Sequence, residues 1–404
     1  MNNLVIICAI LLLVLLFLKV PVYIAVLSAS AVYFIGTPGM NLSIFAQKTI
    51  SGAEGLSLLA IPFFVCAGIF MNYTGVTKRI MNCCEVLTAR MPGGLAQVNI
   101  LLSTLMGGLS GSSLADAAMQ CKMLVPTMES KGYSKSFSTV ITAASGMVVP
   151  LIPPGVGLII YGCINNISIG KLFIAGIGPG IVLCVTLMIF THFLSKKRGY
   201  LPSRTTKIPV SEKIAAVKPA FLPLLLPIII IGGVRIGVFT ASEAGTVAIV
   251  YAVLLGLLYK ELTLKNVMQG CKETVTTTAS IMLIVAAATC FSWILTKEQI
   301  PQQFSQWMIS NIHNKYIFLI MVNIFLLIVG MFIEGNASMI VLAPLLHPVA
   351  MAYGIDDIHF AMVYIFNCTI GAFTPPMGTL MFVSCGITKC PTKDFIKEAV
   401  PFYI

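Results

Sequence analysis

The sequence predicts an all-α protein that crosses a membrane many times, and three observations carry this prediction. Of the 404 residues, 58% are hydrophobic and only 10% are charged, whereas soluble domains are about one quarter charged. Apolar blocks recur along the chain between short polar or Gly/Pro-rich breaks. Shifting the chain against itself by 222 residues aligns several Pro and Gly positions. A spanning helix needs ~20 apolar residues, so this length could hold roughly ten to twelve crossings.

Many of the apolar blocks are too short for a straight crossing, being only about 12 to 17 residues long. Short blocks that end in Gly, Ser or Pro predict re-entrant hairpins and broken helices, which are tolerated at membrane depth only when buried in protein or lining a cavity. The first block has neither a basic start nor a small-residue cleavage site, so we expect a retained helix and not a signal peptide. In order, the blocks are 4–36, 57–73, 95–109, 114–128, 137–152, 156–167, 170–195, 219–236, 244–259, 278–296, 316–333, 337–353, 359–373 and 377–388.

Two polar, mildly amphipathic stretches, 41–55 and 263–278, each precede a long apolar block. A plain loop and an interfacial helix lying along the membrane surface both fit this composition. Because the stretches also correspond to each other at a shift of about 222, we assign each as an arm helix of its half of the chain.

The repeat divides the chain into two copies of one unit. The first, 1–195, contains a hairpin and broken helix over 95–167, and the second, 219–404, contains the equivalent over 316–388. The segment 196–218 between them holds one acid, Glu212, against seven basic residues: Lys196, Lys197, Arg198, Arg204, Lys207, Lys213 and Lys218. Since basic loops favour the cytoplasmic side, the net charge of +11 indicates membrane orientation and not nucleic-acid binding.

The Pro and Gly matches are the main evidence for the repeat, because these residues determine where the backbone breaks. Leu matches are frequent in any apolar chain. Gly132 aligns with Gly354, and Pro153-Pro154 aligns with Pro375-Pro376. Duplicated halves with interrupted helices at matching positions point to the binding site of a secondary transporter. A duplicated channel would share the symmetry, but it would not need two Ser/Gly-rich breaks and two Pro-Pro breaks that meet in one region.

The breaks have a composition suited to binding ions. In the first half they are 107–116 and 145–155, and in the second half 330–338 and 367–378. Proline removes a backbone donor and glycine lets the chain leave helical geometry, so a break exposes free carbonyls and free N–H groups. Carbonyls with Ser or Thr hydroxyls suit a dehydrated Na⁺, and helix N-termini suit a carboxylate. The alternative is that these small residues only mediate close helix packing.

Asp116 and Glu334 are the only acids within these breaks. A carboxylate inside a membrane costs ~3 kcal/mol on insertion scales and is therefore a functional candidate. Asp116 could coordinate a cation, contact substrate hydroxyls or carry a proton, and a helix-capping or gate-stabilising role is the alternative.

The sequence does not favour an enzyme. An intramembrane enzyme would need a pair such as Ser with Lys, two facing aspartates, or His with Glu, and these segments contain no such pair. The four histidines and twelve cysteines have no metal-ligand spacing. We therefore expect no catalytic residues, and we expect the cysteines to pack as small hydrophobic residues.

Five motifs together resemble the large membrane subunit of the tripartite ATP-independent periplasmic (TRAP) transporters. They are Leu58-Leu-Ala-Ile-Pro62-Phe63-Phe64, the Ser110-Gly-Ser-Ser…Ala115-Asp116 break, Ile152-Pro153-Pro154, Phe239-Thr240…Glu243-Ala244 and Gly371…Thr374-Pro375-Pro376. They occur in the order typical of the family and span nearly the whole chain.

This resemblance implies an inverted-repeat, elevator-type importer in the bacterial inner membrane that is coupled to Na⁺. It also implies a small four-helix membrane subunit and a periplasmic binding protein as partners, besides membrane lipid. The binding protein would deliver an organic acid, such as sialic acid, a four-carbon dicarboxylate or a related sugar acid. A stand-alone cation-coupled dicarboxylate carrier, which needs no binding protein, is the alternative, and a passive channel would ignore the Na⁺ gradient.

The resemblance also assigns site residues. The first Na⁺ region would comprise Ser110, Ser112, Ser145, Gly146, Val148 and Pro150, and the second Gly330, Gly371, Thr374 and Met377. Substrate contacts would come from Ser112, Asp116, Gly155 and Asn336. The chain departs from the family pattern at Glu334, where Asp is usual, and at Val149 and Gly155, where Gly and Ser are common.

Overall fold

The computed structural model describes residues 3–18, 20–204, 206 and 208–403, and every regular element in them is a helix. Within these described residues, six helices are long and apolar enough to cross a membrane, or eight if each of two bent helix pairs counts as one span. The all-α, multi-pass prediction is therefore confirmed. The spans are fewer than ten to twelve because many apolar blocks form helices of only 10–17 residues.

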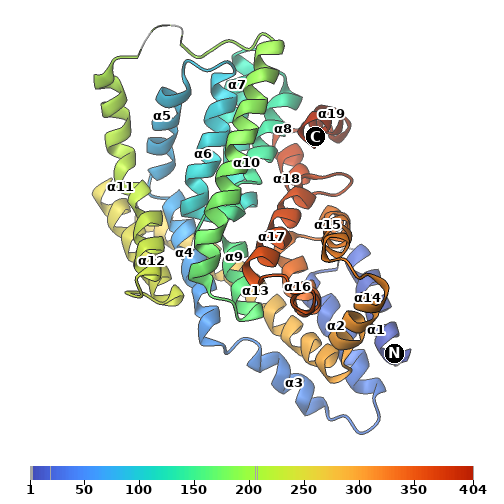
Figure 1. Cartoon of the computed structure of the whole chain (residues 1–404). Helices are drawn as coiled ribbons and strands as arrows, with labels where there is room; N and C mark the ends of the chain where they lie inside the picture. The colour runs from blue at the N-terminus through green and yellow to red at the C-terminus, as the bar shows by residue number, and fades with distance from the viewer. Residues whose placement is uncertain (1–2, 19, 205, 207, 404) are drawn as a thin grey trace.

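The first half begins with two helices and a short arm, continues through a bent pair and two helices that meet at a tight tip, and ends on a long helix (Figure 1). Pro21 precedes α2 and divides the first apolar block, since proline cannot continue the preceding helix. The elements are α1 (Asn3–Phe17), α2 (Val22–Gly36), α3 (Leu42–Ser51), η1 (Leu56–Leu59), α4 (Ala60–Asn72), α5 (Val76–Thr88), α6 (Gly94–Ser110), α7 (Ser113–Ser130), α8 (Lys135–Gly146), η2 (Val149–Leu151), α9 (Val156–Asn165) and α10 (Ile169–Lys197).

The rest of the chain opens with longer helices and ends on the short helices α19 and η3. Its elements are α11 (Val210–Arg235), α12 (Ala241–Leu258), α13 (Leu264–Lys297), α14 (Ile300–Asn311), α15 (Lys315–Phe332), α16 (Gly335–Ala352), α17 (Asp357–Phe373), α18 (Thr379–Thr388), α19 (Thr392–Ala399) and η3 (Val400–Phe402).

Helix boundaries recur at the spacing seen in the sequence. Helices α7 and α16 each have 18 residues and begin 222 residues apart. Gly132 and Gly354, which follow them, both have positive φ, which glycine adopts without steric penalty. Both Pro-Pro peptide bonds are cis. The division into repeats at 1–195 and 219–404 stays our interpretation of these matches.

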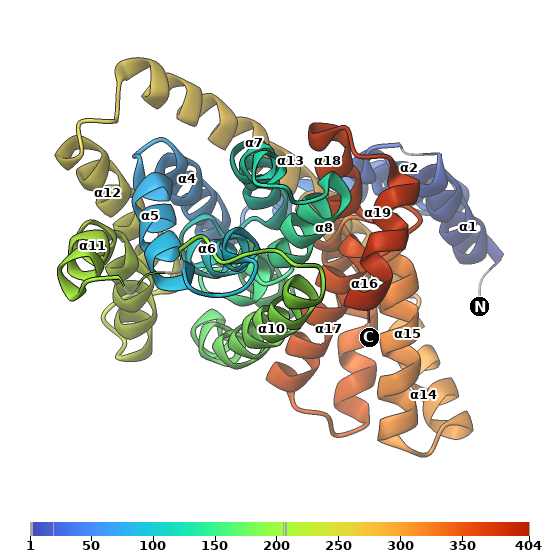
Figure 2. The same ribbon diagram turned by 90° about the horizontal axis from the view of Figure 1, so that it is seen from above.

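The two expected arm helices differ. Asn41 caps α3 by accepting a hydrogen bond from the Ser43 N–H, and α3 lies obliquely to the long helices in Figure 1. The stretch 263–278 is not a separate helix, because α13 continues through it for 34 residues and runs along one side of the molecule in Figure 2. In the first half, Gly52 and Gly55 interrupt the helix after α3. Thr274 and Thr277, at the equivalent positions of the second half, let α13 continue without interruption.

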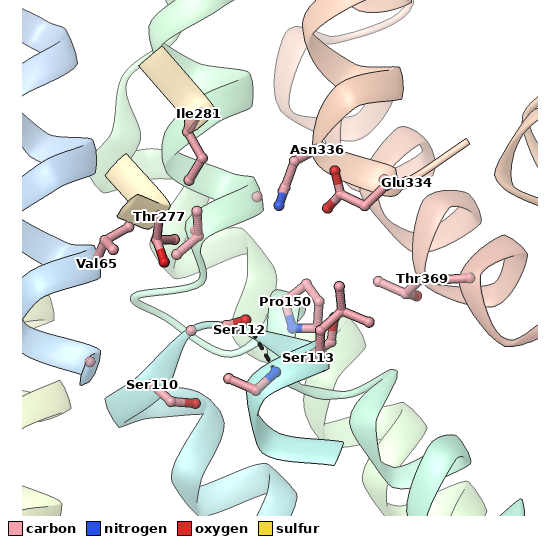
Figure 3. Close-up of a pocket in the computed structure, with 18 of the residues that line it drawn as sticks. Val65, Ser110, Ser112, Ser113, Pro150, Thr277, Ile281, Glu334, Asn336 and Thr369 are labelled. Atoms are coloured by element: carbon pink, nitrogen blue, oxygen red, sulfur yellow. Dashed lines mark hydrogen bonds between the residues drawn. The ribbon is translucent and has the colours of Figure 1, made fainter. Parts of the chain in front are cut away.

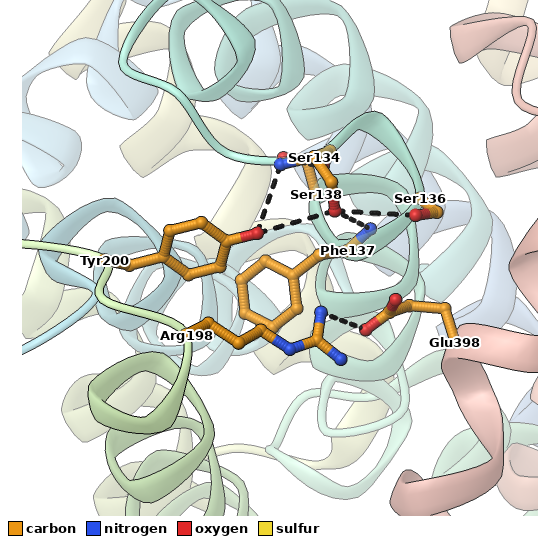
Figure 4. A network of polar contacts seen from close by, with 7 residues as sticks. All are labelled: Ser134, Ser136, Phe137, Ser138, Arg198, Tyr200 and Glu398. Carbon is orange, nitrogen blue, oxygen red and sulfur yellow. Dashed lines mark hydrogen bonds and ion pairs between the residues drawn. The ribbon is translucent and has the colours of Figure 1, made fainter.

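The first residues of the basic linker are anchored to the protein, as Figure 4 shows. The Arg198 guanidinium pairs with Glu398 of α19 (Nη1–Oε1 2.5 Å) and lies over the Phe137 ring at the start of α8. The Tyr200 hydroxyl accepts a hydrogen bond from the Ser134 N–H (3.2 Å). The linker therefore leaves α10 in a fixed direction, and Lys207 within it lies outside the described residues.

Candidate substrate and cation site

A cavity of about 170 Å³ lies where the tips of both halves meet (Figure 3). Its walls come from the α6–α7 tip, the break before α9, the start of α16, and α17 and α18. Helices α4 and α13 close one side through Asn72 and Thr277 among others. Segments from both halves thus share one pocket.

The first-half tip is built from a helix end and a helix start. Helix α6 stops at Ser110, Gly111 turns the chain with a φ of +62°, and the Ser112 hydroxyl accepts a hydrogen bond from the Ala115 N–H (3.4 Å). The Gly111 carbonyl accepts the Val156 N–H of α9 (3.2 Å), which ties the tip to the break. The Ser110 hydroxyl is buried and has no hydrogen-bond partner among the described residues.

The second-half tip presents an acid and an amide. Glu334 precedes α16 and its carboxylate accepts the Ala337 N–H (3.2 Å), so it caps this helix as Ser112 caps α7. Its side chain and that of Asn336 come from the same turn and both project into the cavity in Figure 3. Glu334 is the only charged residue among the described residues that line the cavity.

Four helices begin at the cavity wall. Their first residues, all of which line the cavity, are Ser113 of α7, Val156 of α9, Gly335 of α16 and Thr379 of α18. The N-terminus of a helix carries free N–H groups and about half a positive charge, so it attracts anions. Helices α9 and α18 begin after glycines, with no side chain capping their first N–H groups.

Those two glycines are required by close backbone contacts. A β-carbon on Gly155 would lie 2.3 Å from the Pro150 carbonyl oxygen, and one on Gly378 would lie 2.5 Å from that of Ala372. Real contacts at such distances do not occur, so a larger residue would displace the break. The departure from the family pattern at Gly155 therefore permits the close approach of this break to the Pro150 carbonyl.

The predicted first Na⁺ residues divide between the cavity and the protein behind it. Ser110, Ser112 and Pro150 line the cavity. Ser145, Gly146 and Val148 are buried behind them. The atoms available to coordinate a cation are hydroxyl and carbonyl oxygens, which suit Na⁺. The Ser110 hydroxyl, which has no hydrogen-bond partner among the described residues, could serve as one of these ligands. Na⁺ binding here stays a prediction.

None of the four predicted second Na⁺ residues lines the cavity. Gly330 and Gly371 pack backbone to backbone, since a β-carbon on Gly330 would lie 2.8 Å from the Gly371 Cα. The Thr374 hydroxyl donates to the Ile370 carbonyl (2.7 Å), and Met377 lies half-buried two residues before α18. Na⁺ binding at these four residues stays a prediction.

Among the predicted substrate residues, Ser112 and Asn336 line the cavity and the other two do not. Gly155 lies directly before the lining residue Val156. The Asp116 side chain is 2% exposed and points into the protein, where its Oδ2 accepts hydrogen bonds from Ser103 (2.7 Å) and Gln120 (2.8 Å). The structure therefore gives no support to a contact between Asp116 and a solute in this cavity.

Sequence reasoning missed several polar residues. Asn72, Thr277 and Thr369 line the cavity, and each lies in or beside an apolar block of its helix. Asn99 and Gln120 are fully buried beside Asp116. A search for single amide or hydroxyl residues inside apolar helices would have found them, because such residues need partners.

Broken helices from both parts of the chain that meet at one cavity, in an all-helical multi-pass protein, define a membrane transport permease. The family model described as "Tripartite ATP-independent periplasmic transporter, DctM component" matches residues 9–404. The chain belongs to this family. It is thus the large permease component of a tripartite transporter and not an enzyme, and it is a multi-pass protein of the bacterial inner membrane.

Named relatives cover nearly all of the chain. A sialic acid TRAP transporter large permease protein of Vibrio cholerae is 40% identical over 96% of this chain and 91% of its own length. The 2,3-diketo-L-gulonate TRAP transporter large permease protein of Escherichia coli is 36% identical over 95% and 90%. The C4-dicarboxylate TRAP transporter large permease protein of Pseudomonas aeruginosa is 36% identical over 88% and 83%.

One solved structure supports the fold. The YdaH transporter of Alcanivorax borkumensis aligns with a TM-score of 0.62 over 89% of this chain and 85% of its own, at 13% identity. At that identity the likeness concerns the helical arrangement alone.

Proposed function

We propose that this permease imports a small organic acid anion together with Na⁺, after a periplasmic binding protein delivers the anion. The observation that carries the proposal is the set of four helix N-termini at one cavity. No side chain caps the first turn of α9 or α18, so the N–H groups there that the backbone leaves unpaired are available to a carboxylate. The Val156 N–H is not one of them, because it donates to the Gly111 carbonyl.

The charge of the cavity supports coupling to a cation. Glu334 and a bound organic anion would place two negative charges in one small cavity, and none of its described lining residues is Lys or Arg. Helix dipoles offset part of this charge, and a cation held at Ser110 and Ser112 would offset more. Two Na⁺ entering with a monovalent anion carry one net charge inward, worth about 2.3 kcal/mol per 100 mV.

The position of the cavity supports an elevator mechanism. It lies between the tips and breaks on one side and helices α4 and α13 on the other, so movement of the tips past α4 and α13 would carry the solute across the membrane. A small four-helix subunit and a binding protein would complete the transporter. Sialic acid, a dicarboxylate and a related sugar acid are the candidate substrates, as the names of the relatives suggest.

Uptake into proteoliposomes that contain the permease, its small subunit and the binding protein tests the proposal. We expect accumulation of the organic acid to require both an inward Na⁺ gradient and the binding protein, and to increase with an inside-negative potential. Accumulation without the binding protein would identify a stand-alone carrier. Flux that only equilibrates the solute and ignores the Na⁺ gradient would identify a channel.

A further inference from the structure

A second cavity, of about 450 Å³, lies next to the first along the same helices. On α13, Ile281 lines the first cavity and Val285 lines the second. On α16, the neighbouring residues Met339 and Ile340 line the first and the second cavity respectively, and α9 also contributes to both. The arm helix α3 forms the remaining wall of the second cavity. The two cavities are therefore consecutive along the boundary between α13 and the helices α9 and α16.

One layer of apolar side chains separates the two cavities. Ile281 and Val285 are one turn apart on α13, which is about 6 Å at 1.5 Å per residue. These two residues, with Met339 and Ile340, are at most 9% exposed. Because moving a charged group through an apolar layer is costly, an anion in the second cavity would stop directly beside the first.

The charge of the second cavity is opposite to that of the first. Lys48 of α3 is the one charged residue among its described lining residues, whereas Glu334 has this place in the first cavity. Within the part of the chain that the structure describes, Lys48 forms no ion pair. A cleft lined by one sign of charge concentrates ions of the opposite sign. The second cavity therefore attracts anions.

An aromatic wall and polar groups accompany this charge. The Lys48 Nζ lies 5.8 Å from the ring centroid of Trp293, which lines the cavity. The Lys297 Nζ lies 5.5 Å from the same centroid and adds positive charge from outside the lining. The side chains of Asn166 and Ser292 line the cavity and make no hydrogen bond to a described residue. Ammonium, indole and free polar groups together suit a hydroxylated carboxylate.

The second cavity opens at the end of the molecule opposite the basic linker. Its rim residues Ser51, Asn166 and Thr296 are exposed. Asn166 ends α9, and α10 then runs for 29 residues to the linker, which is about 43 Å at 1.5 Å per residue. Because basic segments favour the cytoplasm, this arrangement puts the opening on the periplasmic side.

On the basis of the import function proposed above, we propose that the second cavity is an outer anion site. The organic acid binds there before it reaches the first cavity, and the Lys48 ammonium contacts its carboxylate. Movement of α9 and α16 along α13 would then displace the apolar layer and join the two cavities. The anion would pass from a cationic site to the helix N-termini and the bound cation of the first cavity.

Quenching of tryptophan fluorescence tests the outer anion site in the purified full chain. The chain has two tryptophans, so Trp307→Phe leaves Trp293 as the reporter. We expect iodide to quench Trp293, and sialic acid or succinate to protect it, whereas glucose should not. Lys48→Gln should reduce iodide quenching several-fold and abolish the protection, and Lys48→Arg should keep both. Neutral acrylamide should quench all variants equally, because the ring stays accessible.

The control is Lys315→Gln, which removes an exposed charge at the start of α15 and should behave as wild type. No protection by either acid, or equal protection in Lys48→Gln, would overturn the outer anion site. Protection by phosphatidylglycerol in nanodiscs, in place of the acids, would assign the cavity to a lipid headgroup and would also overturn it.

This measurement is independent of the proposed function, because it needs neither a Na⁺ gradient nor transport. Uptake that ignores Na⁺ and the binding protein would refute the proposed function, while protection that depends on Lys48 would still establish the outer anion site. Normal Na⁺-driven uptake without protection of Trp293 would refute the outer anion site alone.

Discussion

At the scale of single residues, the cavity depends on which side chain precedes each helix. Ser112 caps α7 and Glu334 caps α16 from equivalent positions 222 residues apart. One half therefore presents a neutral hydroxyl and the other a negative charge. Ser112→Ala and Glu334→Gln therefore separate the effect of a hydroxyl ligand from that of a negative charge.

Replacing the hydroxyl should impair coupling. We expect Ser112→Ala to reduce Na⁺-dependent uptake about five- to tenfold, because it removes a cap worth about 1 kcal/mol and a proposed ligand. Ser112→Thr should retain most activity. Ser130→Ala, at the exposed far end of α7, is the control. Equal uptake by Ser112→Ala and wild type would remove Ser112 from the cation site.

Removing the charge should weaken cation binding while keeping the cap. In Glu334→Gln the side-chain oxygen can still accept the Ala337 N–H, but the cavity loses the one acid among its described lining residues. We expect the Na⁺ concentration for half-maximal uptake to rise about tenfold, equivalent to about 1.4 kcal/mol. The matched control is Glu129→Gln on α7. An unchanged Na⁺ dependence would show that Glu334 does not assist the cation.

At the scale of elements, the positions of the helix breaks decide which residues reach the cavity. Gly52 and Gly55 separate α3 from α4, whereas Thr274 and Thr277 let α13 continue as one helix. As a result Thr277 of α13 reaches the cavity wall. Helix α17 similarly carries Thr369 to the cavity, and its position depends on its N-terminal cap.

The cap of α17 gives a stability prediction. Asp356 accepts hydrogen bonds from the Ile358 and His359 N–H groups, both at 3.0 Å. Asp356→Ala should therefore lower the free energy of unfolding by about 1 kcal/mol, seen as a lower Tm of the purified permease. Asp356→Asn can still accept these bonds and should match wild type. If both variants were equally destabilised, the negative charge and not the cap would be responsible.

At the scale of the whole molecule, the first-half tip packs tightly against α4. A β-carbon on Gly68 of α4 would lie 2.6 Å from the Ser110 carbonyl oxygen at the tip. Any movement of the tip relative to α4 must change this close backbone contact. We therefore expect the absence of a side chain at Gly68 to affect transport as well as packing.

Filling this contact should slow transport. We expect Gly68→Ala to reduce the maximal uptake rate several-fold, because the backbone of the tip must shift to admit the methyl group. Gly178→Ala is the control, since a β-carbon at this exposed position of α10 meets nothing within 4 Å. Similar rates for the two variants would show that α4 and the tip do not need this close contact during transport.

Much of this architecture follows from the sequence. The apolar blocks and the Pro and Gly matches predicted a multi-pass helical protein with breaks within 107–116 and 145–155, and the helices are interrupted within both ranges. The family resemblance assigned Ser112, Asn336, Asp116 and Gly155 to one substrate site, and the first two line the cavity whereas the last two do not. The boundary of the second arm was wrong, because propensity alone does not show whether a polar stretch joins the next helix.

By itself, the amino-acid order determined where the chain breaks, since Pro and Gly act locally on backbone geometry. Only the tertiary structure decided which groups the breaks bring together: four helix starts around one cavity, and Asp116 turned away from it into a polar network. The direction of a side chain on a helix depends on the neighbours that pack against it. In this chain those neighbours come from distant segments, which no local pattern specifies.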